Sequence, residues 1–206
     1  MSNITIQAIA FDWGGIFTEG TFDSAAAASL AQLYQCSVED INAVYLPLMA
    51  ELERGAMDFE AFHARFGEGM GKPCELDIFR ELFLGSIHER VAMFQVLQSV
   101  PKDYRVAMLS NNVPLLCDVV RDDPRMQRIE HFVFSNEIGV RKPDAKAFAA
   151  LSEALEVAPQ ATVFIDDNAD NIAACEALGF QGIHLDTMAG FRQRWQALLP
   201  DVPLHT

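Results

Sequence analysis

The sequence predicts an α/β protein with a Rossmann-like parallel sheet as its core and an α-helical segment inserted after the first strand. Short apolar, β-rich runs alternate with amphipathic helical patterns from residue 88 onward, which is typical of a parallel sheet with crossover helices. One further buried strand stands alone near the N-terminus, and residues 19–87 show helical patterns and no convincing strand. We therefore expect a core formed by residues 1–18 and 88–206, with residues 19–87 as a helical cap.

The core elements can be placed in order along the chain. The first strand is "ITIQAIAF", residues 4–11, an apolar run typical of a buried parallel strand, and Gly14 and Gly15 end it. Helical and strand patterns then alternate over residues 88–100, 104–112, 113–122, 131–139, 144–155, 161–168, 169–180 and 182–186, before a final helix that ends near residue 199. Several of these strands end in polar residues, which directs attention to one edge of the sheet.

The inserted region predicts a small helical bundle. Residues 23–35 and 38–55 carry helical patterns, the second with an expected break near Pro47 and a stop at Gly55. Asp58 is placed to cap a third helix, in which Phe59, Phe62 and Phe66 fall on one face. We expect this phenylalanine stripe to form the core of the cap.

Composition and charge exclude several classes of protein. The 206 residues are 50% hydrophobic and carry a formal net charge of -14, so neither nucleic acid nor an anionic membrane is an expected partner. The four cysteines are widely spaced and suggest no zinc site. The N-terminus lacks a signal-peptide pattern, and no apolar run reaches membrane-spanning length. We expect a cytoplasmic protein, monomeric or homodimeric, whose site for any anion needs local cations or a metal.

Polar residues gather where the predicted strands end. In an open parallel sheet the carboxyl ends of the strands form the ligand-binding edge. These ends, and the loop "GVRKPD", carry Asp12, Ser110, Asn111, Lys142, Asp166 and Asp167. Each segment alone fits an ordinary turn, loop or helix cap. Clustered carboxylates, however, repel one another unless a cation joins them, and hard oxygen ligands suit Mg²⁺. The hydroxyl, amide and ammonium groups would bind a phosphoryl group, and a carboxylate could act as nucleophile.

The segments "FDWGG", "LSNN", "GVRKPD" and "VFIDDNADN", in this order, resemble the four motifs of the haloacid dehalogenase (HAD) superfamily. The inserted helices resemble the small cap of that superfamily, and the pattern is similar to its sugar-phosphatase-like members, including α-D-glucose-1-phosphate phosphatase. The resemblance covers nearly the whole chain. It implies a Mg²⁺-dependent phosphatase that acts on a small phosphorylated metabolite through an aspartyl-phosphate.

The resemblance also implies a role for each motif residue. Asp12 would be the nucleophile and a metal ligand, and the backbone carbonyl of Gly14 would face the metal. Lys142 would balance the charge of Asp12 and of the phosphate, after a Lys142–Pro143 bond that is often cis in relatives. The remaining roles are phosphoryl binding by Ser110 and Asn111, and Mg²⁺ binding by Asp167 directly and by Asp166 directly or through water.

One position departs from the pattern of most phosphatases in this family. They carry a second aspartate two residues after the nucleophile, which protonates the leaving group, and here that position is Gly14. Three alternatives follow. The chain could be a Mg²⁺-dependent phosphatase whose proton comes from water, from the substrate or from the cap, with Glu19, Glu53 and His63 as candidate donors. It could be a metal-independent 2-haloacid dehalogenase, against which the paired Asp166 and Asp167 argue. It could be a non-catalytic phosphate-binding module.

Two further residues have more than one interpretation. Trp13, beside the nucleophile, could line a pocket or pack in the core. Arg54 could reach a substrate anion from the cap, although an exposed arginine at a helix end is the more common situation.

Overall fold

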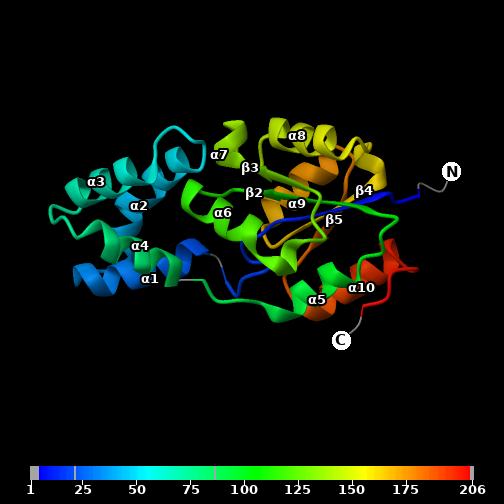
Figure 1. Ribbon diagram of the computed structural model, residues 1–206, viewed down its shortest axis with the longest axis horizontal. Helices are drawn as coiled ribbons and strands as arrows, with labels where there is room; N and C mark the ends of the chain where they lie inside the picture. The colour runs from blue at the N-terminus through cyan, green and yellow to red at the C-terminus, as the bar shows by residue number, and fades with distance from the viewer. Residues whose placement is uncertain (1–4, 21, 86, 205–206) are drawn as a thin grey trace.

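A computed structural model describes residues 5–20, 22–85 and 87–204 of the chain. Its sheet has five parallel strands in the order β3-β2-β1-β4-β5, which confirms the predicted fold class (Figure 1). The strands are β1 (Ala8–Phe11), β2 (Arg105–Ser110), β3 (His131–Phe134), β4 (Thr162–Asp166) and β5 (Gln181–His184). The order of connection reverses at β1, so the ends of β1 and of its neighbours β2 and β4 form the switch point where ligands bind in such sheets.

Helices cover both faces of the sheet because both faces are apolar. Alternation along β1 sends Ile9 and Phe11 to one face and Ala8 and Ala10 to the other, and all four are fully buried. The first face packs against α5 (Val91–Ser99), α6 (Pro114–Asp122) and α10 (Met188–Leu198). The second packs against α8 (Ala145–Leu155) and α9 (Ala169–Ala177), and a short helix, α7 (Ser135–Ile138), follows β3.

The inserted region folds into four helices beside the sheet (Figure 1). They are α1 (Phe22–Tyr34), α2 (Val38–Leu52), α3 (Phe59–Gly69) and α4 (Leu76–Gly85). Helix α4 lies within the region predicted to be helical, although its own pattern was not assigned. Its signal is the spacing of Phe79 and Phe83, four residues apart and both fully buried.

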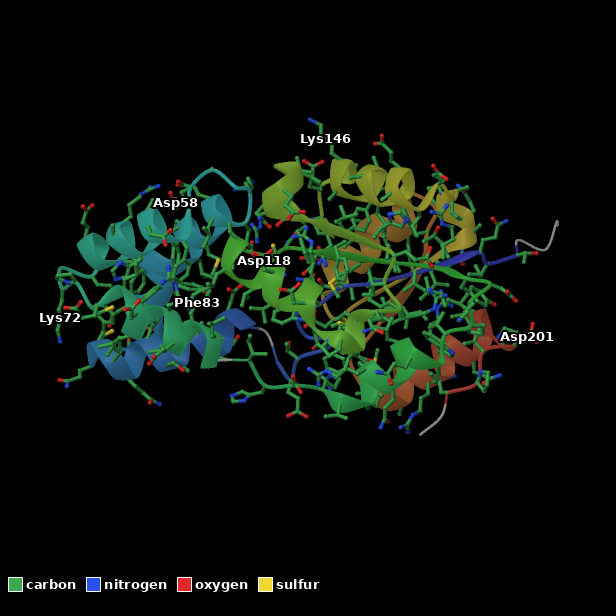
Figure 2. All side chains as sticks on the ribbon, in the orientation of Figure 1. Asp58, Lys72, Phe83, Asp118, Lys146 and Asp201 are labelled. Carbon is green, nitrogen blue, oxygen red and sulfur yellow. The ribbon has the colours of Figure 1, made fainter. Side chains whose placement is uncertain are left out.

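Aromatic rings fill the centre of the cap. The rings of Phe59, Phe79 and Phe83 pack around that of Phe62 with centroids 5.9–6.0 Å apart, and Tyr45 contributes another ring at 5.9 Å. Figure 2 shows Phe83 inside the bundle, whereas Lys72 lies at its periphery. The phenylalanine stripe is therefore cap core, as the sequence indicated.

The expected break near Pro47 is wrong, since α2 runs from Val38 to Leu52 without interruption. Pro47 lies on the exposed side of the helix, where the carbonyl of Ala43, which loses its partner, can bind water. On the opposite side Tyr45, Leu48 and Met49 are buried. Packing of that apolar side outweighs the lost hydrogen bond.

The two chain crossings between the sheet and the cap lie side by side. Thr18 and Glu89 form an isolated antiparallel bridge, and the Arg90 N–H donates to the Phe17 carbonyl at 2.8 Å. The division at residues 18/19 and 87/88 falls at this bridge and stays a prediction. No helix in the described part of the chain is long and apolar enough to span a membrane.

Candidate active site

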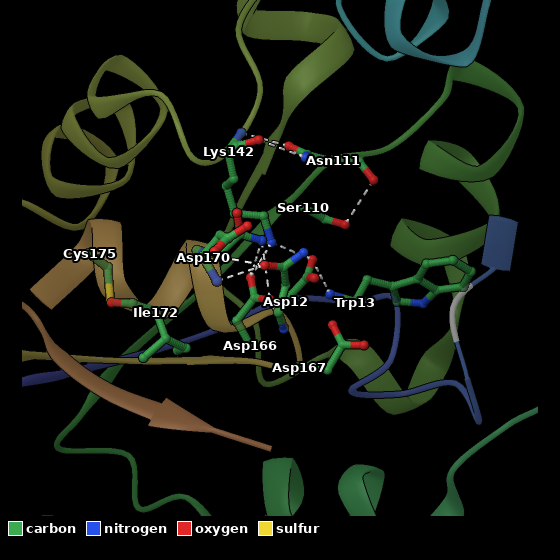
Figure 3. A network of polar contacts seen from close by, with 12 residues as sticks. Asp12, Trp13, Ser110, Asn111, Lys142, Asp166, Asp167, Asp170, Ile172 and Cys175 are labelled. Carbon is green, nitrogen blue, oxygen red and sulfur yellow. Dashed lines mark hydrogen bonds and ion pairs between the residues drawn. The ribbon is translucent and has the colours of Figure 1, made fainter. Parts of the chain in front are cut away.

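Three carboxylates meet where β1 and β4 end. Asp12 follows β1, Asp166 ends β4 and Asp167 comes next in the chain. One oxygen from each lies within 4.8 Å of the others. Figure 3 shows the three side chains gathered beneath the loop that carries Lys142. The predicted convergence of these strand ends is thus present in the structure.

Lys142 reaches into this cluster from the loop between α7 and α8. Its ammonium group lies 2.8 Å from Asp12 Oδ1 and 2.6 Å from Asp166 Oδ2. The lysine is only 3% exposed, so both ion pairs are shielded from water. Three carboxylates and one ammonium group leave a charge of -2 in a small buried volume.

The neighbours of Asp166 occupy both of its oxygens. Asn171 Nδ2 donates to both at 3.1–3.2 Å, the Asn168 N–H donates to Oδ1 at 2.8 Å, and Lys142 holds Oδ2. By contrast, no donor from another described residue contacts Asp12 Oδ2 or the Asp167 carboxylate, which bonds to its own backbone N–H. Asp166 therefore acts as an anchor for Lys142, and Asp12 and Asp167 offer free oxygens.

Asn111 uses its side chain to hold the lysine loop. Its Nδ2 donates to the Lys142 carbonyl at 3.1 Å, and its Oδ1 accepts from the Lys142 N–H at 2.8 Å. The Lys142–Pro143 bond in this loop is cis, which confirms the prediction. Ser110 is buried beside Asn111. Because the Asn111 amide is engaged, its remaining group for a phosphoryl oxygen is the backbone N–H.

Burial and crowding shift the pKa values of the cluster. Burial raises the pKa of Asp12 from 3.8 to about 7; Lys142 opposes this shift and Asp166 adds to it. Burial also raises the pKa of Asp167, again reinforced by Asp166. Burial alone would lower the pKa of Lys142, but Asp12 and Asp166 outweigh it and raise that pKa. The single ammonium group of Lys142 is thus too little positive charge to neutralise the carboxylates of the cluster.

A pocket of about 170 Å³ opens over the carboxylates, between the sheet edge and the cap. The cap contributes Asp23 of α1, Met49 of α2 and Glu53. The core contributes Asp12, Trp13, Gly14, Asn111, Asn112, Val113, Leu116, Arg141, Lys142, Asp167, Asn168 and Asn171. Polar groups therefore surround Asp12, and apolar side chains form part of the wall.

The structure distinguishes between the candidate proton donors, and between the interpretations of Arg54 and Trp13, that the sequence left open. Glu53 lines the pocket, whereas Glu19 is exposed and does not line it. His63 Nε2 bonds to the Cys74 carbonyl at 2.8 Å within the cap, and Arg54 donates to the Ala50 carbonyl on the cap surface. Trp13, 7% exposed, both packs in the core and lines the pocket.

Sequence reasoning missed several polar residues of the pocket. Asn112 is buried, and its Nδ2 has no partner among the described residues, although the repeated asparagine of "LSNN" was a signal. Arg141 Nε lies 2.5 Å from Glu53 Oε2. The position of Arg141 directly before Lys142 in the sequence could have indicated that it belongs to the pocket. Asp23 accepts a hydrogen bond from the Tyr45 hydroxyl at 2.9 Å, and only tertiary packing could reveal that contact.

The donor set fits Mg²⁺. The ion takes oxygen ligands and uses few carboxylates, completing its shell with water and substrate phosphate. Asp12 and Asp167 each offer a carboxylate oxygen to this position, and Gly14 lines the same pocket. A divalent cation would also balance the charge of -2 that the side chains leave.

A family model described as haloacid dehalogenase-like hydrolase matches residues 6–179. The chain belongs to this family. It is therefore a hydrolase, and the resemblance seen in its four motifs is confirmed.

Known proteins of similar sequence or structure include a phosphatase. The sesquiterpene phosphatase astK of Aspergillus oryzae is 23% identical over 197 residues, which is 90% of this chain and 93% of that protein. A "predicted HAD-like family hydrolase" from Porphyromonas gingivalis aligns with a TM-score of 0.80 and 26% identity, over 95% of this chain and 98% of that one. A HAD family enzyme from Bacteroides thetaiotaomicron, solved with magnesium and inorganic phosphate, aligns with a TM-score of 0.73 and 20% identity, over 87% and 93%.

Proposed function

We propose that the protein is a Mg²⁺-dependent phosphatase that hydrolyses a small phosphate monoester through an aspartyl-phosphate on Asp12. The observation that carries this proposal is the cluster of Asp12, Asp166 and Asp167 around a buried Lys142, with a net charge of -2. A phosphoryl dianion could not enter such a cluster without a divalent cation. Metal-free halide displacement has no use for Asp167, whose ionised form burial disfavours.

Asp12, Asp167 and the Gly14 carbonyl would hold the metal ion. Asp166 would act through water and through its ion pair with Lys142, since its oxygens are already occupied. Bound Mg²⁺ supplies Lewis-acid neutralisation of charge on the phosphoryl oxygens.

The side chains then divide the work of phosphoryl transfer. Asp12 attacks phosphorus, and the bond from phosphorus to the leaving oxygen breaks. Lys142 neutralises the charge that develops on the phosphoryl group, while the Ser110 hydroxyl and the Asn111 backbone N–H bind its oxygens. Water next attacks the aspartyl-phosphate and releases inorganic phosphate. Movement of the cap would exclude water from the first step and admit it to the second.

The pocket favours a small substrate with some apolar surface. Its volume is about 170 Å³, and Trp13, Met49, Val113 and Leu116 form apolar parts of its wall. A sugar phosphate is one substrate class, because the anomeric oxygen of a sugar 1-phosphate is a weaker base than an alkoxide. A short prenyl-type phosphate is another that the apolar wall would accept. Both belong in a substrate panel.

A phosphatase assay with p-nitrophenyl phosphate tests the proposal. We expect phosphate release that requires Mg²⁺ and stops with EDTA. In Asp12→Asn we expect a loss of at least about 10⁴-fold, because the nucleophile is gone. Chloride release from 2-chloropropionate is the parallel measurement. Undiminished turnover after chelation, or halide release in place of phosphate release, would replace the phosphatase by a dehalogenase.

Thermal unfolding of Asp12→Asn is the control for folding. The pKa of Asp12 in the metal-free native state is about 7, against 3.8 for the free side chain. The native state therefore binds the extra proton between about pH 4 and 7 and loses stability as the pH rises through that window. Asparagine does not ionise, so the metal-free variant should unfold at the same or a higher temperature at pH 7.

A further inference from the structure

The cap places two acidic side chains in the pocket that have no role in the phosphoryl transfer described above. They are Asp23, in the first turn of α1, and Glu53, directly after α2. Both come from the inserted helices, and both face the carboxylate cluster across the same cavity of about 170 Å³. Glu53 is 6% exposed, which is unusual for a glutamate and calls for a reason.

Phosphoryl transfer to Asp12 leaves one chemical requirement unmet. Departure of an alkoxide is slow unless an acid protonates it. The acids that line the pocket, among the described residues, are Asp12, Asp23, Glu53 and Asp167. Under the proposed function Asp12 is the nucleophile and Asp167 holds the metal, and Gly14 has no side chain. Asp23 and Glu53 are left as proton donors.

Hydrogen bonding separates these two acids. The Tyr45 hydroxyl donates to Asp23 at 2.9 Å, and this bond favours the charged carboxylate. Glu53 Oε2 instead pairs with Arg141 Nε of the core at 2.5 Å. Glu53 is therefore the acid of the pair that is held against the core loop carrying Lys142, whereas Asp23 is held by a partner within the cap.

The surroundings of Glu53 bring its pKa close to neutral. Burial, reinforced by the neighbouring carboxylates of Asp23 and Asp12, raises the pKa of Glu53 from 4.5 to about 7. Arg141 pulls in the opposite direction. A group of this kind can give up a proton and regain it at neutral pH.

We propose that Glu53 of the cap is the acid–base catalyst of the reaction, in the role left open at Gly14; the inference rests on the phosphatase function proposed above. In the first step Asp12 forms its bond to phosphorus as the phosphorus–alkoxide bond breaks. The Glu53 carboxyl proton passes to the leaving oxygen, which departs as the alcohol.

In the second step the Glu53 carboxylate takes a proton from water. The water oxygen bonds to phosphorus, and the bond from phosphorus to Asp12 breaks. Inorganic phosphate leaves, with Glu53 protonated and Asp12 ionised again, so that the sum is one ester and one water converted to alcohol and phosphate.

Arg141 sets the position of this acid relative to the nucleophile. It belongs to the core loop and directly precedes Lys142, whose ammonium group lies 2.8 Å from Asp12. Its ion pair with Glu53 thus ties the end of α2 to the loop that neutralises the nucleophile. The guanidinium group also stabilises the Glu53 carboxylate that exists between the two steps.

The test compares two substrates of similar size whose leaving groups differ in basicity. p-Nitrophenyl phosphate releases a weak base that needs no proton, whereas benzyl phosphate releases a strongly basic alkoxide. In Glu53→Gln we expect kcat/KM to fall about 10²-fold or more for benzyl phosphate and less than about threefold for p-nitrophenyl phosphate. An equal fall on both substrates would mean that Glu53 only holds the cap, and no fall on either would place the donor elsewhere.

The pH dependence gives a second readout. With benzyl phosphate, kcat/KM of the wild type should decline as the pH rises above about 7, because Glu53 then loses its proton. The groups that set this titration are Arg141, Asp23 and Asp12. We expect Glu53→Gln to lack the decline. A wild type and a variant with the same profile would overturn the proposal.

Two variants control for structure. Asp23→Asn changes the other cap acid, and we expect it to alter the rates on both substrates by the same factor. Glu53→Asp keeps a carboxyl group opposite Arg141, and we expect it to retain more benzyl phosphate turnover than Glu53→Gln. A preferential loss of benzyl phosphate turnover in Asp23→Asn would make Asp23 the acid. The kcat/KM of the wild type on p-nitrophenyl phosphate tests the phosphatase function separately, because it reports the first step, in which this leaving group needs no proton from Glu53.

Discussion

The core and the cap bury polar groups in different ways. In the core, Asp12, Asp166 and Lys142 partner one another at strand ends that the sheet holds in register. The cap has an interior of aromatic rings, and its two pocket acids lie on the side that faces the core. One of them, Glu53, takes its partner, Arg141, from the core. The polar groups of the core thus find their partners within the core. Glu53 of the cap, by contrast, has its partner only when the cap is packed against the core.

A close backbone contact at the end of α2 also joins the cap to the core. Gly55 has φ +67, and a Cβ there would lie 2.2 Å from the Asn136 carbonyl oxygen of α7. Backbone therefore meets backbone two residues after Glu53. The contact places the end of α2 against the core, as does the ion pair of Glu53 with Arg141.

The largest expected effect is a loss of stability from a substitution in the cap that leaves the proposed metal site of the core unchanged. Phe62→Ala removes a fully buried ring at the centre of the cap, and we expect a loss of about 3–5 kcal/mol in the free energy of unfolding. Denaturant titration measures it. The Mg²⁺ affinity of the folded variant, measured by calorimetry, should stay within about twofold of wild type, because the ligands lie in the core. Ile78→Ala, at a 49% exposed cap position, should change stability by less than about 0.5 kcal/mol. A weaker metal site in Phe62→Ala would show that the regions are not independent.

A smaller effect tests the metal site in the core. Mg²⁺ at 100 times its dissociation constant should stabilise the native state by about 2.7 kcal/mol, which raises Tm by about 5–10 °C in a chain of this size. Asp167→Asn removes a proposed metal ligand and should abolish the rise. Asp170→Asn, at an exposed position in α9, should keep it. An unchanged rise in Asp167→Asn would remove Asp167 from the ligand set.

The smallest effect distinguishes the two adjacent glycines. Gly15 has φ +71, and a Cβ there would lie 1.9 Å from Asp167 Oδ2, so Gly15→Ala should cost about 1–2 kcal/mol and displace the carboxylate. A Cβ at Gly14 meets nothing within 4 Å. We expect Mg²⁺ to bind about tenfold or more weakly to Gly15→Ala, and with wild-type affinity to Gly14→Ala. Equal affinities in the two variants would contradict this assignment of the glycines.

The sequence by itself determined the sheet and the position of its polar edge. Strand patterns and parallel topology place Asp12, Ser110 and Asp166 at neighbouring strand ends, because parallel strands present their carboxyl ends at one edge. Helical spacing also located the phenylalanine core of the cap, and the resemblance to the family indicated the cis bond before Pro143. It failed at Pro47, where the packing of one side of α2 outweighed a local propensity.

Only the tertiary structure decided which cap residues reach the pocket. In the sequence Glu19, Glu53 and His63 were equivalent candidates, because each is a polar residue in or next to a helix. Docking of the cap buries Glu53 against Arg141, whereas His63 bonds to the Cys74 carbonyl within the cap and Glu19 is exposed. Such contacts join residues that are distant in the chain, so neither periodicity nor spacing encodes them. The local sequence pattern therefore predicts the fold of the core. The proposed proton donor, by contrast, depends on how the cap and the core pack against each other.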